Sequence, residues 1–240
     1  LAIFKGTLYI AWLEAGEKEW NKLYIKHWNG SEWLADGEGF GLKPGHTILS
    51  PVLLFGENEG HLAWSEAGEN GVFQIWYAAW NKEKWTVYPE TLNKNPGSQA
   101  FNPAMILFKG VPWLAFQERD PGAAGFRLHL LHLEGGKWQN DNHLLPDGGA
   151  TGKLDPALGT RNETLFLAWE ERNVKGVPGI FVRQLLPGTK ENRVSPLNLA
   201  ADSFGMNPSF LSEGNDLYLS WKENNSGDIF QNHVARFSEK

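Results

Sequence analysis

The sequence of 240 residues contains no cysteine and only two methionines. The absence of cysteine excludes disulfides, thiolate zinc sites and thiol catalysis, although it does not decide the compartment. No apolar run approaches the roughly 20 residues that a membrane-spanning helix needs, so we expect no membrane insertion. Lys and Arg number 22 against 28 Asp and Glu, a net charge of −6. The broad basic surface of a nucleic-acid-binding protein is therefore missing as well. We expect a monomer whose ligand is a glycan or a protein.

Tryptophan, glycine and proline are abundant, with 12, 27 and 13 copies. An aromatic residue followed two positions later by glutamate recurs every 52 or 53 residues, at Trp12, Trp64, Phe116, Trp169 and Trp221. A proline preceded by a small polar residue recurs with the same spacing, in the pairs Ser50-Pro51, Asn102-Pro103, Asp155-Pro156 and Asn207-Pro208. A third marker is Trp33, Trp85 and Trp138. Three markers in one phase indicate five internal repeats.

Each repeat contains four short apolar segments separated by Gly, Asn and Pro clusters, which is typical of antiparallel strands. The pattern predicts an all-β fold, a five-bladed β-propeller of four-stranded antiparallel blades, with a β-solenoid as the alternative. The single domain 1–240 would divide into blades at about 1–49, 50–101, 102–154, 155–206 and 207–240. The fifth repeat is short, so its blade is expected to be three-stranded. The innermost strand of each blade is expected to follow the proline, as in 103–108.

Alternation along the second strand of each repeat places the Trp ring on one face and a small residue on the other, as with Trp64 and Ala63. We expect these rings to form the core between blades, where a ring fills the gap beside a small side chain.

The five-repeat arrangement resembles in architecture the five-bladed propeller lectins of the tachylectin-2 type, whose own repeat lacks the Trp-x-Glu motif. The segment from Ile25 to Gly30 followed by Trp33 is loosely similar to repeats of fungal fucose-binding propeller lectins. These resemblances imply a propeller fold and a carbohydrate ligand, and no ligand residues are carried over from them.

The glutamate of the Trp-x-Glu pattern is the most regular polar residue of the chain, present as Glu14, Glu66, Glu118, Glu171 and Glu223. A catalytic residue is needed once, whereas a structural one is needed in every blade. Recurrence therefore favours carboxylates that accept hydrogen bonds from backbone N–H groups of a neighbouring loop. The alternative is a repeated ligand site on one rim.

Residues that break the repeat are the candidates for specific binding. Arg119 and Arg172 follow the glutamate in the third and fourth repeats only, and Trp20 lies in the loop after the first. An aromatic ring with guanidinium and carboxylate groups suits a sugar, whose apolar face stacks while its hydroxyls form hydrogen bonds. The histidines show no ligand spacing, so no metal and no cofactor is expected.

The favoured interpretation is a non-catalytic carbohydrate-binding propeller, extracellular or at the cell surface, with shallow sites on the rim of the loops between second and third strands. The alternatives are a protein-interaction scaffold and a five-bladed glycoside hydrolase. By analogy, five-bladed glycosidases carry their carboxylates on inner strands of different blades. The segments 1–4, 52–55 and 104–108 contain no acid, which argues against hydrolysis.

Overall fold

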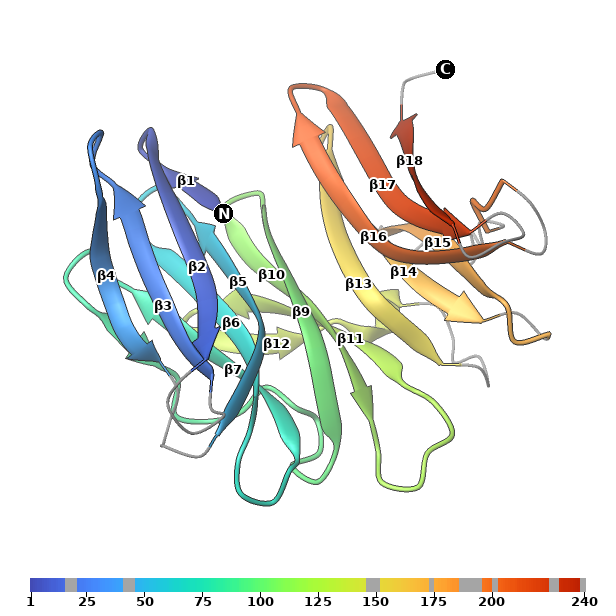
Figure 1. Ribbon diagram of the computed structural model, residues 1–240, viewed down its shortest axis with the longest axis horizontal. Coiled ribbons are helices and arrows are strands. Elements are labelled where there is room, and N and C mark those ends of the chain that lie inside the picture. The colour runs from blue at the N-terminus through green and yellow to red at the C-terminus, as the bar shows by residue number, and fades with distance from the viewer. Residues whose placement is uncertain are drawn as a thin grey trace. The chain divides into compact units, whose positions relative to one another are not determined.

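The computed structural model describes residues 1–15, 21–40, 46–145, 152–172, 175–185, 196–199, 203–224 and 229–237. These residues form 18 strands in five antiparallel sheets (Figure 1) and one short 3-10 helix, η1 (Asn142–Leu144). Within these ranges there is no α-helix, and no helix long and apolar enough to cross a membrane. The all-β prediction is therefore confirmed.

Every sheet follows the order of the chain, with each strand bonded to the next. The first two sheets are β1 (Ala2–Phe4), β2 (Thr7–Ala15), β3 (Asn21–Trp28) and β4 (Trp33–Phe40), then β5 (Thr47–Phe55), β6 (Gly60–Ala67), β7 (Phe73–Trp80) and β8 (Trp85–Val87). The third is β9 (Gln99–Phe108), β10 (Val111–Arg119), β11 (Arg127–Glu134) and β12 (Lys137–Asn140). The fourth and fifth are β13 (Lys153–Arg161), β14 (Thr164–Arg172) and β15 (Pro178–Leu185), then β16 (Phe204–Glu213), β17 (Asp216–Asn224) and β18 (Phe230–Phe237).

The five sheets correspond to the five predicted repeats. The fourth and fifth sheets each have three strands among their described residues, where four were expected of the fourth and three of the fifth. The chain forms two compact units, Leu1–Pro112 and Trp113–Lys240. Each unit is described by itself below.

The first strand of each later sheet begins before the proline, which corrects the predicted boundary. The expected strand 103–108 is β9 (Gln99–Phe108), and the proline lies within it. In β5, β13 and β16 the pairing register shifts across the polar residue and the proline, which marks a β-bulge. Proline has no N–H to donate to the ladder, so a bulge is one of the few strand positions that accept it.

The polar residue before each proline has a left-handed backbone. The φ angles of Ser50, Asn102, Asp155 and Asn207 are +49°, +52°, +48° and +52°. Asn and Asp tolerate this region better than other residues with a side chain, and it turns the side chain away from the direction expected of a regular strand. The polar-Pro pair is thus a repeated device that presents one polar group from the middle of each first strand.

The Trp rings of the repeat form the core between neighbouring sheets, as predicted. In the first unit Trp64 is fully buried in one cluster with Leu23 and Ile25 of β3. In the second unit Trp221 shares a cluster with Ala168 of β14, the small residue of the preceding sheet. Each marker also has an aromatic or histidine ring opposite it on the third strand, in the pairs Trp12–Tyr24, Trp64–Trp76, Phe116–His129, Trp169–Phe181 and Trp221–His233.

Candidate functional site

The repeated glutamates lie inside the protein, except for the first. Glu66, Glu118, Glu171 and Glu223 are buried, whereas Glu14 is exposed. The indole N–H of the same Trp-x-Glu unit donates to the carboxylate, at 2.7 Å from Trp64 to Glu66, 2.9 Å from Trp169 to Glu171 and 2.8 Å from Trp221 to Glu223. Residues two apart on a strand share a face, which makes this bond possible.

The other oxygen of each of these carboxylates contacts a residue just before the first strand of its own sheet, or on that strand. His46 Nδ1 lies 2.6 Å from Glu66 Oε1, and Lys153 Nζ lies 3.7 Å from Glu171 Oε1. Glu223 Oε1 accepts hydrogen bonds from Leu199 N at 2.8 Å and from the Ser203 hydroxyl. In the third repeat, where Phe116 replaces Trp, His129 Nε2 is 3.5 Å from Glu118. This geometry supports the structural role that recurrence favours, but it corrects the expected donor. The donor shared by Glu66, Glu171 and Glu223 is an indole N–H, and a backbone N–H donates to Glu223.

The arginines predicted to bind a ligand are both exposed at the end of the second strand. The Arg119 guanidinium lies over the Phe126 ring, 5.0 Å from its centroid. Arg172 donates to the Gly176 carbonyl at 3.2 Å. Trp20, the third predicted contact, lies outside the described residues. The two described arginines are therefore on the expected rim, and their part in binding stays a prediction.

A pair of carboxylates that breaks the repeat lies beside this rim, on β13 and β14. Asp155 is the polar residue before the proline, and Glu170 follows the marker Trp169. Strand pairing sets Leu154 opposite Glu170, so the two acids lie on adjacent strands. The residues equivalent to Glu170 in the other repeats are Leu13, Ser65, Gln117 and Lys222, and those equivalent to Asp155 are Ser50, Asn102 and Asn207. The fourth repeat alone has an acid at both positions.

Glu170 holds its proton at an unusually high pH. Only 7% of the residue is exposed, and burial is the largest cause that raises the pKa of Glu170 to about 7. The negative charge of Asp155 raises it further, and the positive charge of Arg172 opposes part of this effect. A carboxyl group that is still protonated near neutral pH can donate a proton, and a second carboxyl group beside it can take another role in the reaction. This division of roles is the chemical requirement for acid catalysis by two carboxylates.

Amide side chains from the two neighbouring sheets hold Asp155 in place. Gln117 Oε1 of β10 accepts a hydrogen bond from the Asp155 N–H at 2.7 Å. Asn207 Nδ2 of β16 donates to Asp155 Oδ2 at 3.1 Å. Gln117 is buried, Asp155 is half-buried and Asn207 is exposed, so the site opens to solvent on the Asn207 side.

From the sequence, Asp155 is one of four polar residues that precede a proline, and Glu170 is not among the candidate site residues. The three inner segments without an acid belong to the first three repeats, whereas β13 of the fourth begins at Lys153 and includes Asp155. The available signal was the comparison of equivalent positions, which shows two acids in one repeat and none at these positions in the others.

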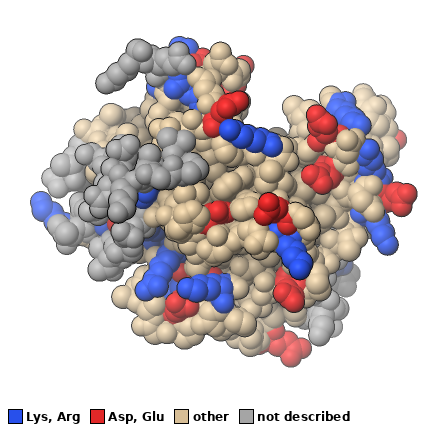
Figure 2. Space-filling model, turned by 180° about the vertical axis from the view of Figure 1, so that it is seen from behind, with Lys and Arg blue, Asp and Glu red and all other residues tan. Residues whose placement is uncertain are grey.

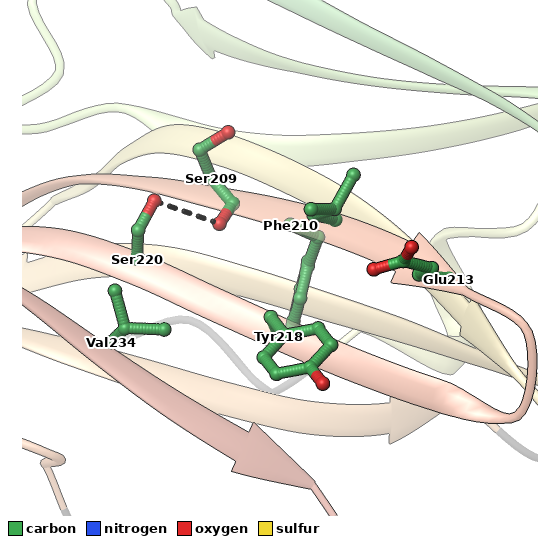
Figure 3. Close-up of a pocket in the computed structure, with 7 residues that line it drawn as sticks. Ser209, Phe210, Glu213, Tyr218, Ser220 and Val234 are labelled. Carbon is green, nitrogen blue, oxygen red and sulfur yellow. Dashed lines mark hydrogen bonds between the residues drawn. The ribbon is translucent and has the colours of Figure 1, made fainter.

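A hollow on the last sheet is the other candidate (Figure 3). It has a volume of about 340 Å³ and is lined by Ser209, Phe210, Leu211, Glu213, Tyr218, Ser220 and Val234. Ser220 Oγ donates to the Ser209 carbonyl within it at 3.4 Å. The lining contains one carboxylate and no second titratable group near neutral pH, so it lacks the chemistry of the Asp155 site.

Surface charge and metal-ligating side chains point to no further site among the described residues. Figure 2 shows acidic and basic side chains interspersed over one face of the molecule. Among the residues that the structure describes, no group of three or more His, Asp or Glu side chains could hold a metal ion.

Solved structures with a similar fold include several glycoside hydrolases and one polysaccharide lyase. The lyase is 12% identical with a TM-score of 0.62, over 96% of this chain and 55% of that one. An endo-arabinase from Bacteroides thetaiotaomicron is 14% identical with a TM-score of 0.55, over 97% of this chain and 95% of that one. An α-L-arabinofuranosidase from Lactobacillus brevis is 14% identical with a TM-score of 0.57, over 100% and 90%. An exo-1,5-α-L-arabinanase from a bovine ruminal metagenomic library is 12% identical with a TM-score of 0.51, over 97% and 89%. No protein-family model and no curated protein matches the sequence.

At this level of identity the comparisons show the fold, which is propeller-like and all-β. A resemblance to tachylectin-2-type lectins is not shown by these comparisons. The favoured interpretation as a non-catalytic carbohydrate-binding propeller is contradicted, because the similar structures include several glycoside hydrolases, the third of the functions considered from the sequence. The repeated glutamates are the most regular polar residues of the sequence, whereas Asp155 and Glu170 occur together in one repeat.

Proposed function

We propose that the chain is a glycoside hydrolase in which Glu170 is the general acid and Asp155 is its ionised partner. One observation carries the proposal: the fourth repeat alone pairs two carboxyl groups, and the pKa of the buried one is raised to about 7. The likeness of the fold to arabinanases and an arabinofuranosidase supports the same reaction class.

In the proposed reaction Glu170 gives its proton to the glycosidic oxygen as the bond from that oxygen to the anomeric carbon breaks. The leaving group departs as an alcohol. The carboxylate of Asp155 stabilises the positive charge that develops at the anomeric carbon. A water oxygen then bonds to that carbon, and the proton it releases returns to the carboxyl pair. Atoms and charge balance as one water consumed for each glycosidic bond cleaved.

The exposed arginine beside the pair fits this reaction. Arg172 lies two residues beyond Glu170, and its charge already acts on that carboxyl. A guanidinium at the rim can hydrogen-bond the hydroxyls of a sugar ring, so Arg172 and Arg119 are proposed as substrate contacts. The ligand would be a glycan. An extracellular or cell-surface location is part of the proposal, because polymeric glycans are met outside the cell.

A panel of glycosides tests the function. We expect the full chain to release nitrophenol from para-nitrophenyl α-L-arabinofuranoside or β-D-xyloside, or reducing ends from linear arabinan, at pH 6. Because protonated Glu170 is required, kcat should fall as the pH rises through about 7, by about tenfold for each further pH unit. Activity that increases above pH 7, or no release from any of the three substrates, would contradict the proposal.

A further inference from the structure

The side chain of Asn207 donates a hydrogen bond to Asp155, and the two residues share the same backbone conformation. Both residues precede a proline, both have a left-handed backbone, and both lie at a bulge in the first strand of their sheet. This shared backbone conformation brings Asn207 Nδ2 within 3.1 Å of Asp155 Oδ2, although the residues are 52 positions apart. The hydrogen bond joins β16 to β13, on neighbouring sheets of the second unit.

We propose that Asn207 is a positioning residue for Asp155, and that Gln117 fixes the backbone of the same residue from the other side. The inference rests on the proposed function, in which Asp155 must face the reacting carbon. Gln117 and Asn207 reach Asp155 from β10 and β16, so the residue is held by amides from both neighbouring sheets. A small misplacement of a catalytic group costs much rate, so both hydrogen bonds matter for the proposed reaction.

The first unit contains an equivalent hydrogen bond between two residues that have no part in the proposed reaction. There Ser50 Oγ donates to Asn102 Oδ1 at 3.0 Å, again between residues that precede a proline. Both partners are neutral in that pair. In the pair between β16 and β13 the acceptor is the carboxylate oxygen Oδ2 of Asp155, and a hydrogen bond to a carboxylate is stronger than one between neutral groups.

The orientation of Asp155 affects Glu170 through charge. The charged groups that act on Glu170 are Asp155 of β13 and Arg172 of its own strand. The other strands contribute neutral neighbours: β15 sets the apolar Ile180 opposite Glu170, and β16 supplies Asn207 to Asp155. Lys153 of β13 lies 3.7 Å from Glu171. If Asp155 turns away, the repulsion that helps to hold the proton on Glu170 weakens, so its pKa falls.

Two substitutions of Asn207 separate positioning from structure. Asn207→Gly removes the amide and keeps a backbone that accepts φ near +52°. Asn207→Asp keeps a residue type that already occupies this backbone position at Asp155, and it adds a negative charge. We expect kcat to fall about 10- to 100-fold in both variants with little change in KM. The carboxyl 13C titration of Glu170 should shift to lower pH in Asn207→Gly and to higher pH in Asn207→Asp.

Ser50→Gly is the matched control, because it removes a neutral hydrogen bond from the same backbone position in the first unit. It should leave kcat and the Glu170 titration unchanged. A Glu170 midpoint that stays at the wild-type value in both Asn207 variants would overturn the positioning role. If the midpoint shifts as expected while the wild type hydrolyses none of the three glycosides, the positioning contact stands and the proposed function fails.

Discussion

Glu170→Gln is expected to abolish hydrolysis and at the same time to stabilise the protein above pH 7. Glutamine has nearly the same shape but cannot donate an acidic proton, so kcat should fall about 10²- to 10⁴-fold. Stability changes in the other direction because burial and Asp155 make the ionised form of Glu170 unfavourable in the folded protein. Loss of activity with a gain in stability distinguishes a functional buried acid from a structural one.

The sign of the pH effect follows from the pKa values. The pKa of Glu170 is about 7 in the folded chain against an ordinary value of 4.5. Between these values the folded chain binds more protons than the unfolded chain, so the free energy of unfolding decreases as the pH rises through this window. Glutamine removes that dependence. At pH 8 the free energy of unfolding of the variant should therefore exceed that of the wild type by about 1–2 kcal/mol, and its unfolding temperature should be higher.

Glu66→Gln is the matched control for this experiment. Glu66 is also buried, but it accepts the indole N–H of Trp64 at 2.7 Å and lies 2.6 Å from His46 Nδ1. Replacing this carboxylate weakens charge-assisted hydrogen bonds and should cost about 1.5–3 kcal/mol with activity retained. Thermal unfolding at pH 5 and pH 8 measures both variants. If Glu170→Gln is destabilised at pH 8 to the same extent as Glu66→Gln, Glu170 has a structural role.

Trp64→Ala should give the largest loss of stability in the chain. The ring is completely buried between the first and second sheets, in one cluster with Leu23 and Ile25. Its removal leaves a cavity and takes away the indole N–H that donates to Glu66, at an expected cost of about 3–5 kcal/mol. Trp33→Ala is the control, because Trp33 is 38% exposed on an outer hairpin, where its ring lies 5.6 Å from that of Trp28. Urea unfolding measures both, and equal midpoints would show that the inner and outer rings are wrongly assigned.

The repeat markers predicted the fold because they recur at equivalent positions of the sheets. In the second, fourth and fifth repeats the Trp is buried and its indole donates to the glutamate two residues later, and side-chain alternation alone placed both on one face. The start of the first strand was predicted too late, because proline is usually read as a strand boundary. At Pro51, Pro156 and Pro208 a bulge with a left-handed residue accommodates it within the strand.

The functional pair could not be predicted by the same reasoning. Glu170 lies next to Glu171, and its strand neighbour is an apolar residue, so local pattern gives it no distinction. Its raised pKa depends on burial by the surrounding sheets and on Asp155, which is 15 positions away in the sequence. The hydrogen bonds from Gln117 and Asn207 to Asp155 depend likewise on how neighbouring sheets pack. Such contacts between repeats follow from tertiary structure.

The titration of the Glu170 side chain by 13C NMR, in the full chain and in Asp155→Asn, tests the central claim most directly. Asparagine already occupies the equivalent position at Asn102 and Asn207, so the variant retains the backbone conformation. We predict a midpoint near pH 7 in the wild type and a lower midpoint in Asp155→Asn, because the neighbouring negative charge is removed. A wild-type midpoint near 4.5, unchanged by Asp155→Asn, would contradict the assignment of these residues as an acid and its ionised partner.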